Sequence, residues 1–317
     1  MHCINPRILR HVAGAGLGIV GAFALAFLFL KGTRGTGFLR LQLAASHAPG
    51  MPTPGPAPHG DWLAAAELGA AAAIAGTLAG ASRISPVAPL IAGLPFLAIK
   101  MYFLSSVEAQ LGVLRHAPAT LMPAAQEAIF SGVFLLLGGA LAVSAAMPWR
   151  WLARPPRAHG PNWHAFGVLS GLAAIPVLWY VLQVDEATTS VVGPPARLHF
   201  PGEFWILMLT GAAILGLLAS TRWSSPVAAV ITGAPLFLVG VFTMLAPGAA
   251  QTVIDKLIAD YRWQLSTESL AASGWLVMFG GILLAAASMP WRWRRNQPDT
   301  PDKFCLPRAI PHDTTLE

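Results

Sequence analysis

The sequence is poor in charged residues. Only 11% of its 317 residues are Asp, Glu, Lys or Arg, whereas 55% are hydrophobic. An average soluble domain is about one quarter charged. This chain therefore has too little polar surface to cover a water-facing globule, and a bilayer must be the solvent for much of it.

Cysteine is nearly absent too. The two cysteines, Cys3 and Cys305, lie in terminal segments, so we expect no disulfide framework or Cys-based metal site unless the two tails meet. The sequence also lacks a Walker loop, a nucleophile elbow, a His-Glu-x-x-His motif and a Gly-rich dinucleotide turn. We therefore expect no metal and no cofactor, and nothing in the sequence argues for an enzyme.

Basic residues outnumber acidic ones, with 20 Lys and Arg against 14 Asp and Glu. They lie at the ends of apolar runs and form no patch with interleaved aromatic residues, which argues against nucleic acid as a partner. The partner that the pattern predicts is the lipid bilayer. Arginine outnumbers lysine, and Ala, Gly and Pro are abundant, a bias that indicates a GC-rich bacterial genome.

Long apolar runs are what the sequence has in abundance. A helix needs roughly 20 mostly apolar residues to cross about 30 Å of hydrocarbon. The runs show no period-two alternation, so they predict helices and not barrel strands. The sequence thus predicts an all-α membrane protein with about eight transmembrane helices, at residues 12–30, 62–82, 86–104, 129–147, 163–182, 204–221, 226–246 and 271–289.

The positions of Lys and Arg set the expected orientation, because cytoplasmic loops are enriched in them. With the N-terminus inside, the inner segments hold 12 of the 20 basic residues, and the Arg-rich stretches after the fourth and eighth runs give the strongest signal. We expect a multi-pass protein of the bacterial plasma (inner) membrane with both termini in the cytoplasm.

The two halves of the chain resemble each other. Residues 133–151 align with 275–293 at an offset of 142, with nine of 19 positions identical. Residues 85–103 align with 225–243 at an offset of 140, with seven of 19 identical. Such offsets indicate duplication of one four-helix unit. Because each unit has an even number of spans, we expect two tandem, parallel repeats related by an axis along the membrane normal.

The duplication divides the chain into segments. We expect a first four-helix repeat at 1–160 with a Pro-rich outer loop near 48–60, a second repeat at 161–295, and a disordered cytoplasmic tail at 296–317. Residues 251–265 place their apolar side chains on one helical face, which predicts an amphipathic helix lying on the outer surface or over the bundle.

Both copies of the repeat end in Met-Pro-Trp-Arg-Trp. Tryptophan favours the membrane interface, and arginine favours its cytoplasmic side. We interpret the two clusters as interfacial anchors, and the alternative is a site for anionic lipid. The residues concerned are Trp149, Arg150, Trp151, Trp291, Arg292 and Trp293.

Glycines four residues apart occur at matching places in the first helix of each unit. Gly14 and Gly18 match Gly167 and Gly171. Such pairs let helix backbones approach closely in lipid. We expect them to serve packing inside the bundle, and the alternative is the interface of a homodimer or of a membrane-protein partner.

A Gly-x-Pro pattern recurs in the third and seventh predicted spans. Gly93 and Pro95 match Gly233 and Pro235. Proline removes a backbone donor, so each helix should kink or open there. Matching breaks in two repeats favour a central substrate site of the kind found in transporters, and the alternative is a packing kink.

Glu67 and Lys100 are ionisable residues inside predicted spans. They lie at similar distances from the tight turn between the second and third spans, so we expect them to form an ion pair. The pair either fixes the rotation of two helices or forms a proton or ion site. We expect no chain of buried acids that could relay protons.

Two functions are favoured, and a third, an intramembrane enzyme, is least supported because it needs a polar cluster open to one face. The preferred one is a small transporter or permease with its substrate site between the two repeats, at Gly93, Pro95, Gly233, Pro235, Glu67 and Lys100. The alternative is a non-catalytic membrane scaffold or an accessory subunit of a cell-envelope complex. A transporter predicts an opening at the Gly-x-Pro positions, whereas a scaffold predicts a tightly packed interior.

Overall fold

The protein is helical throughout the described part of the chain, which contains no strand. The computed structural model describes residues 6–47, 61–83, 85–116, 118, 122, 130–146, 162–191, 202–220, 225–258 and 260–289.

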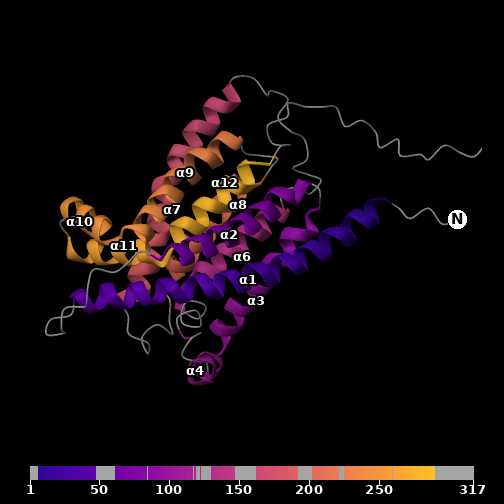
Figure 1. Ribbon diagram of the computed structural model, residues 1–317. Coiled ribbons are helices and arrows are strands. Elements are labelled where there is room, and N and C mark those ends of the chain that lie inside the picture. The colour runs from indigo at the N-terminus through magenta and orange to yellow at the C-terminus, as the bar shows by residue number, and fades with distance from the viewer. Residues whose placement is uncertain are drawn as a thin grey trace, which may run out of the picture.

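The helices form one elongated bundle (Figure 1). The long α1 crosses one side of it, α4 projects from the end of α3, and α10 and α11 lie together at one end (Figure 1). The first half contains α1 (Pro6–His47), α2 (Trp62–Gly80), a 3₁₀ turn (Ala81–Arg83), α3 (Val87–Ser105), α4 (Val107–His116) and α6 (Val133–Ala146). The second half contains α7 (Asn162–Val191), α8 (Gly202–Ala219), α9 (Pro226–Leu245), α10 (Pro247–Leu257), α11 (Tyr261–Ser273) and α12 (Trp275–Ala287).

Local sequence signals explain where two of these helices begin. The Asp61 side chain accepts a hydrogen bond of 2.9 Å from the Ala64 amide at the start of α2. Ser225 caps α9 in the same way through the Val227 amide at 3.3 Å, and Pro226 occupies the first turn, where its missing N–H is not needed. Both starts agree with the predicted spans.

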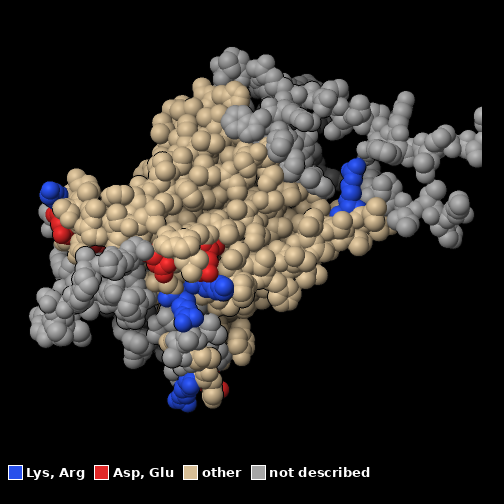
Figure 2. All heavy atoms as spheres, in the orientation of Figure 1, with Lys and Arg blue, Asp and Glu red and all other residues tan. Residues whose placement is uncertain are grey.

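Several helices are long and apolar enough to cross a membrane, which indicates a membrane protein. Within the described residues, five helices qualify by length and composition, and a sixth arises if the bent pair Ser266–Ser273 and Trp275–Ala287 counts as one span. Figure 2 shows a broad uncharged surface, with the visible charges mainly toward the end that carries α4, α10 and α11. The five are Ile8–Gly37, Trp62–Gly80, His164–Glu186, Gly202–Ala219 and Pro226–Leu245.

The predicted total of eight spans is not confirmed. Two of the other three predicted spans correspond to shorter apolar helices, Val87–Phe103 and Val133–Ala146. The last corresponds to the pair formed by α11 and α12, whose axes differ by 54°. The bend lies at Gly274, whose φ of 76° is a left-handed conformation that favours glycine.

The amphipathic helix predicted over residues 251–265 is wrong as a single element. α10 ends at Leu257, Ile258 is extended with φ −115° and ψ 109°, and α11 begins at Tyr261. Asp260 starts the new helix, because its carbonyl oxygen accepts from the Gln264 amide at 2.9 Å. The periodicity of apolar residues continues across this break, which is why the pattern did not reveal it.

The second helix of each half packs against the last helix of the other half. A Cβ atom on Gly76 of α2 would lie 2.7 Å from the Ala285 side chain of α12, and one on Gly216 of α8 would lie 2.6 Å from Val143 of α6. Gly216 follows Gly76 by 140 positions, and Ala285 follows Val143 by 142. α2 therefore packs on the last helix of the other half, and α8 packs on the last helix of the first.

The four glycines predicted to mediate packing all face helices of this chain. A Cβ on Gly18 would meet the Ala88 carbonyl oxygen of α3 at 2.7 Å, and one on Gly171 would meet the Ala228 carbonyl oxygen of α9 at 2.8 Å. Gly14 and Gly167 approach the serines that precede α3 and α9 in the same manner. These glycines bring α1 onto α3 and α7 onto α9.

Candidate functional site

Both helices with a Gly-x-Pro pattern continue through their prolines. α3 and α9 are unbroken at Pro95 and Pro235. The Pro95 side chain is exposed on the surface of the bundle, and Pro235 is half-buried. Neither helix opens at its proline.

The glycines of the same pattern are occupied by helix packing. A Cβ on Gly93 would lie 2.9 Å from the carbonyl oxygen of Gly138 in α6, and one on Gly233 would lie 2.9 Å from that of Gly280 in α12. Backbones therefore touch at both positions. This contact corresponds to the packing alternative for the pattern.

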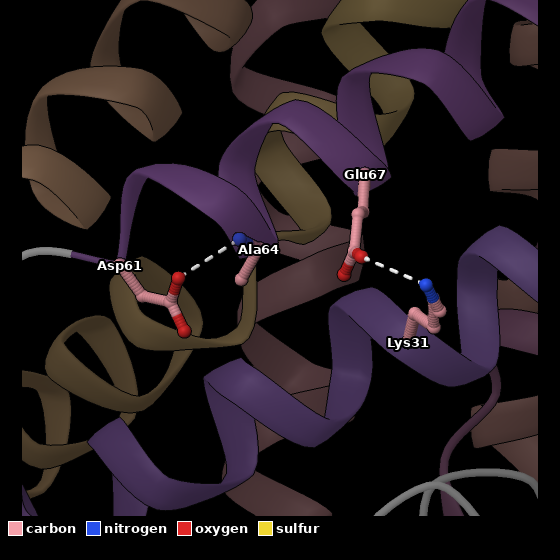
Figure 3. Close-up of polar contacts among 4 residues, drawn as sticks. All are labelled: Lys31, Asp61, Ala64 and Glu67. Carbon is pink, nitrogen blue, oxygen red and sulfur yellow. Dashed lines mark hydrogen bonds and ion pairs between the residues drawn. The ribbon is translucent and has the colours of Figure 1, made fainter.

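Glu67 does not pair with Lys100, and this expectation was wrong. Its carboxylate lies 3.8 Å from the ammonium of Lys31 on α1, and the two side chains point toward each other between α1 and α2 (Figure 3). The predicted first span ended at residue 30, whereas α1 continues past Lys31 to His47. The longer helix brings a cation beside α2 that the sequence had assigned to a loop.

Lys100 lies at the centre of a different set of contacts. Its side chain is fully buried, with 0% of its surface exposed. The ammonium donates a hydrogen bond of 2.7 Å to the Ser131 carbonyl oxygen and lies 6.0 Å from the centre of the Trp205 ring on α8. The carboxylate that acts on this ammonium through its charge is Asp185 of α7.

Asp185 is fully buried as well, with 0% exposure, and it binds the start of α6. Its Oδ1 atom accepts a hydrogen bond of 2.6 Å from the Gly132 amide. The N-terminus of a helix carries partial positive charge, which stabilises a carboxylate in this position. Lys100 and the first turn of α6 thus hold the same acidic side chain.

Asp185 was missed in the sequence because the fifth predicted span ended at residue 182. The helix itself extends to Val191 and its apolar span to Glu186. A signal was present, since the buried residues Leu178, Val181, Leu182 and Asp185 follow the spacing i, i+3, i+4, i+7 of one helical face. An acid that continues an apolar stripe is expected to point inward.

A break in the helical backbone creates the place where these groups meet. Phe130 is helical, Ser131 and Gly132 are not, and α6 begins at Val133. The Ser131 hydroxyl caps α6 by accepting from the Val133 amide at 3.2 Å. A Cβ on Gly132 would lie 3.1 Å from Asp185 Oδ1, so the close approach of the carboxylate depends on glycine.

A second polar seam lies between α7 and α11. The Glu186 carboxylate accepts a hydrogen bond of 2.7 Å from Ser269, and the Gln183 amide donates one of 2.9 Å to Thr267. Glu268 is 3% exposed and lines a cavity of about 10 Å³, which is room for one water molecule. α7 and α11 therefore carry three buried carboxylates, Asp185, Glu186 and Glu268, whereas the sequence had pointed only to Glu67 as an acid inside a span.

An apolar groove of about 420 Å³ lies apart from this centre, between α7, α8 and Ser225, the residue that caps α9. Two serines are the polar residues among its lining, and Ser225 also contacts His164 Nδ1 at 3.1 Å. The residues that line it are Phe166, Ser170, Ala173, Ala174, Val177, Ile214, Leu217, Leu218 and Ser225.

Some predicted features lie outside the described residues. These are the loop near 48–60, the tail at 296–317, and the interfacial clusters Trp149, Arg150, Trp151, Trp291, Arg292 and Trp293. Among the residues that are described, no three His, Cys, Asp or Glu side chains group so that they could hold a metal ion.

The centre is thus built from α3, the start of α6, α7 and α8, and it joins one buried cation to one buried anion at a helix break. The chain matches no protein-family model, and comparisons with curated proteins and with solved structures give no match either.

Proposed function

We propose that this protein is a small transporter or permease whose site is the centre formed by Lys100, Asp185 and the helix break at Ser131–Gly132. One observation carries the proposal: a fully buried cation and a fully buried anion, from different halves of the chain, meet where a helix is interrupted. Discontinuous helices at the interface of two repeats are where transporters bind their substrates and ions.

The proposal includes an architecture of eight spans in two parallel repeats. It is supported by contacts that recur at the sequence offsets of 140 and 142. Gly93 approaches Gly138, and Gly233 approaches Gly280, in the same geometry. In this architecture α3, α6 and the bent α11–α12 pair complete the membrane-spanning set, with both termini in the cytoplasm of a bacterium and the plasma membrane as its location.

The energetics of burial favour a functional centre over a purely structural one. Removing two charges from water costs several kcal/mol per ion, and a well-packed apolar pair is often as stable or more stable. Ionisable residues within membrane helices accordingly mark pathways and binding sites in most membrane proteins. A chain selected only for packing would have no reason to keep Lys100 and Asp185.

The alternative is a membrane scaffold or accessory subunit, and the backbone contacts of Gly93 and Gly233 favour it. They close the positions at which the sequence suggested an opening. The two functions differ in whether water reaches the centre, and this can be measured.

Cysteine accessibility provides the test. Ser131 and Ser144 both belong to the α6 region and are both buried, at 2% and 0% exposure. Each would be changed to Cys in a variant whose native cysteines are replaced by Ser, and membrane vesicles would be treated with a water-soluble thiol reagent. Thr252→Cys, on the exposed surface of α10, is the positive control.

If the protein is a transporter, Ser131→Cys should react and Ser144→Cys should not. Water would then reach the centre at Ser131 but not the packed part of α6 that contains Ser144. If neither reacts while Thr252→Cys does, the centre is dry and the scaffold is the better function. If both react equally, the break is not a defined site, and the proposal is equally wrong.

A further inference from the structure

We infer that the centre binds a small monocarboxylate together with one proton, and that Asp185 occupies the place of the substrate carboxylate in the present structure. The inference rests on the proposed function and names its substrate class. Three features carry it: the donors that hold Asp185, the charge balance of the centre, and the apolar wall beside it.

The groups around Asp185 are those of an anion-binding site. Its carboxylate receives the Gly132 N–H at the start of α6 and the charge of the Lys100 ammonium. Backbone amides at a helix N-terminus and a nearby cation are the combination that binds carboxylates and other anions in proteins. The same donors would hold a substrate carboxylate if the carboxylate of Asp185 no longer needed them.

Among the described residues, no other group named near the centre replaces this charge. The two residues before α6 are uncharged Ser131 and Gly132, and α8 contributes Trp205 and Met208. Glu186, next to Asp185 on α7, is hydrogen-bonded to Ser269 on α11. Glu268 of α11 lines the small cavity beside α9 and α10, and Glu203, at the start of α8, is exposed.

Charge balance then couples the anion to a proton. An uncompensated charge in a low-dielectric interior is strongly unfavourable, so every occupied state should pair Lys100 with one negative charge. When a proton from solvent binds the Asp185 carboxylate, that side chain becomes neutral. It then no longer needs the Gly132 N–H and the partial positive charge at the start of α6 to stabilise it. One incoming monoanion restores the balance, so one proton and one monoanion enter with no net change in charge.

The wall of the centre limits the substrate further. Met208 is fully buried, and a Cβ on Gly132 would lie 2.5 Å from its sulfur. Methionine is a flexible apolar side chain that can move aside for a ligand. Together with the Trp205 ring it offers an apolar surface, which fits a carboxylate with a short hydrocarbon tail. A dianion such as succinate or sulfate would bring a second negative charge, and the described residues of the centre offer only one cation, Lys100.

Calorimetry of purified full-length protein in detergent tests the inference, with sodium butyrate as the probe. Succinate, sulfate and butylammonium chloride are the comparison ligands. Butyrate should bind wild-type protein with uptake of one proton, measured from the dependence of the binding heat on the ionisation enthalpy of the buffer. Flux assays are avoided because butyric acid crosses lipid unaided.

Two substitutions separate the roles of the residues. Asp185→Asn removes the competing charge, so at neutral pH butyrate should bind about tenfold more tightly or better, without proton uptake. Lys100→Met should abolish binding. Because that variant leaves Asp185 without its lysine, the double variant Lys100→Met/Asp185→Asn serves as a folded, uncharged version that should also bind no butyrate. Lys31→Met, at the surface pair, should bind like wild type.

The outcomes distinguish this inference from the proposed function. If Asp185→Asn gains no affinity, or if butylammonium or succinate binds in place of butyrate, the substrate class is wrong, while reactivity of Ser131→Cys would still support a transport site. If no anion binds and Ser131→Cys is also unreactive, the inference and the proposed function both fail.

Discussion

The helix breaks before α6 and α12 share their backbone chemistry and differ in their surroundings. Ser131 caps α6, and Ser273 caps α12, each accepting from the amide two residues later at 3.2 Å. A glycine follows each serine, and each glycine contacts an apolar side chain at the same sequence offset, Met208 in one case and Leu68 in the other. The charged residues have no such counterparts: Lys100 corresponds to Gly240 and Asp185 to Gly32.

The serine cap and the glycine occur at both breaks, whereas Lys100 and Asp185 belong to the first break alone. The second break also has a serine cap and a glycine, and the three atoms nearest to a Cβ on Gly274 would belong to the uncharged residues Leu68, Met244 and Thr36. At this turn the serine cap and the glycine thus occur with uncharged nearest neighbours. The charges at the first break are an addition in one half of the molecule, which is the pattern expected of a site.

A second contrast concerns the first two helices of each half. Gly21 and Gly32 let α1 lie against α2, where a Cβ at either position would come within 2.7 Å of a leucine side chain. The matching residues of α7 are Ala174 and Asp185, and the groove of about 420 Å³ lies beside α7 and α8. The half of the chain that has Ala174 and Asp185 at these positions is thus the half that contains the groove and the buried acid.

The largest effect is expected from breaking the charged centre. Lys100→Met leaves Asp185 buried without its lysine, which should lower the free energy of unfolding by about 3–5 kcal/mol. The double variant Lys100→Met/Asp185→Asn, which leaves no unpaired charge at the first break, should recover most of that loss. Unfolding of the full-length protein in mixed micelles measures both. A double variant as unstable as the single one would mean that the lysine acts through its packing and not through its charge.

The sequence predicted the parts of the fold that depend on runs of apolar residues. α2 and α9 begin and end within two residues of the predicted spans 62–82 and 226–246, because each run has a clear cap at its start. The packing role of Gly14 and Gly18 could likewise be anticipated from spacing alone.

The candidate site could not be predicted in the same way, since its residues come from four separate helices. A hydrophobicity window ends a span at its first acid, so Asp185 fell outside the fifth predicted span although it continues a buried stripe. Lys100 was identified as unusual, but its partner depends on how α3 lies relative to α7, which periodicity does not determine. The break at Ser131 interrupts an apolar run without changing its composition, so it gave no signal.

An intermediate effect is expected where the two halves are alike. Gly93→Ala and Gly233→Ala each place a methyl group 2.9 Å from a backbone carbonyl oxygen of the neighbouring helix, so each should cost about 1–3 kcal/mol of stability. Gly69→Ala is the matched control, because no atom lies within 4 Å of its new Cβ. Its stability should stay unchanged or rise by up to about 1 kcal/mol, since alanine favours helices.

The stability losses of Gly93→Ala and Gly233→Ala, compared with each other, test whether the two halves pack in the same way. Similar losses would strengthen the equivalence of the α3–α6 and α9–α12 contacts. A loss at one glycine and none at the other would show that the two halves pack differently despite their common spacing, and the two-repeat architecture would lose its main support.

The smallest effect is expected at the surface pair, which offers the opposite contrast to the buried centre. Lys31 and Glu67 correspond to Val184 and Leu207 in the second half, where both positions are half-buried and apolar. The Lys31 side chain is 55% exposed and its ammonium lies 3.8 Å from the carboxylate, so solvent weakens the attraction. Lys31→Val/Glu67→Leu should therefore change stability by less than about 1 kcal/mol in the same unfolding assay. A loss as large as that of Lys100→Met would mean that the Lys31–Glu67 pair also contributes strongly to stability. The difference between the two halves would then extend beyond the centre at Lys100 and Asp185.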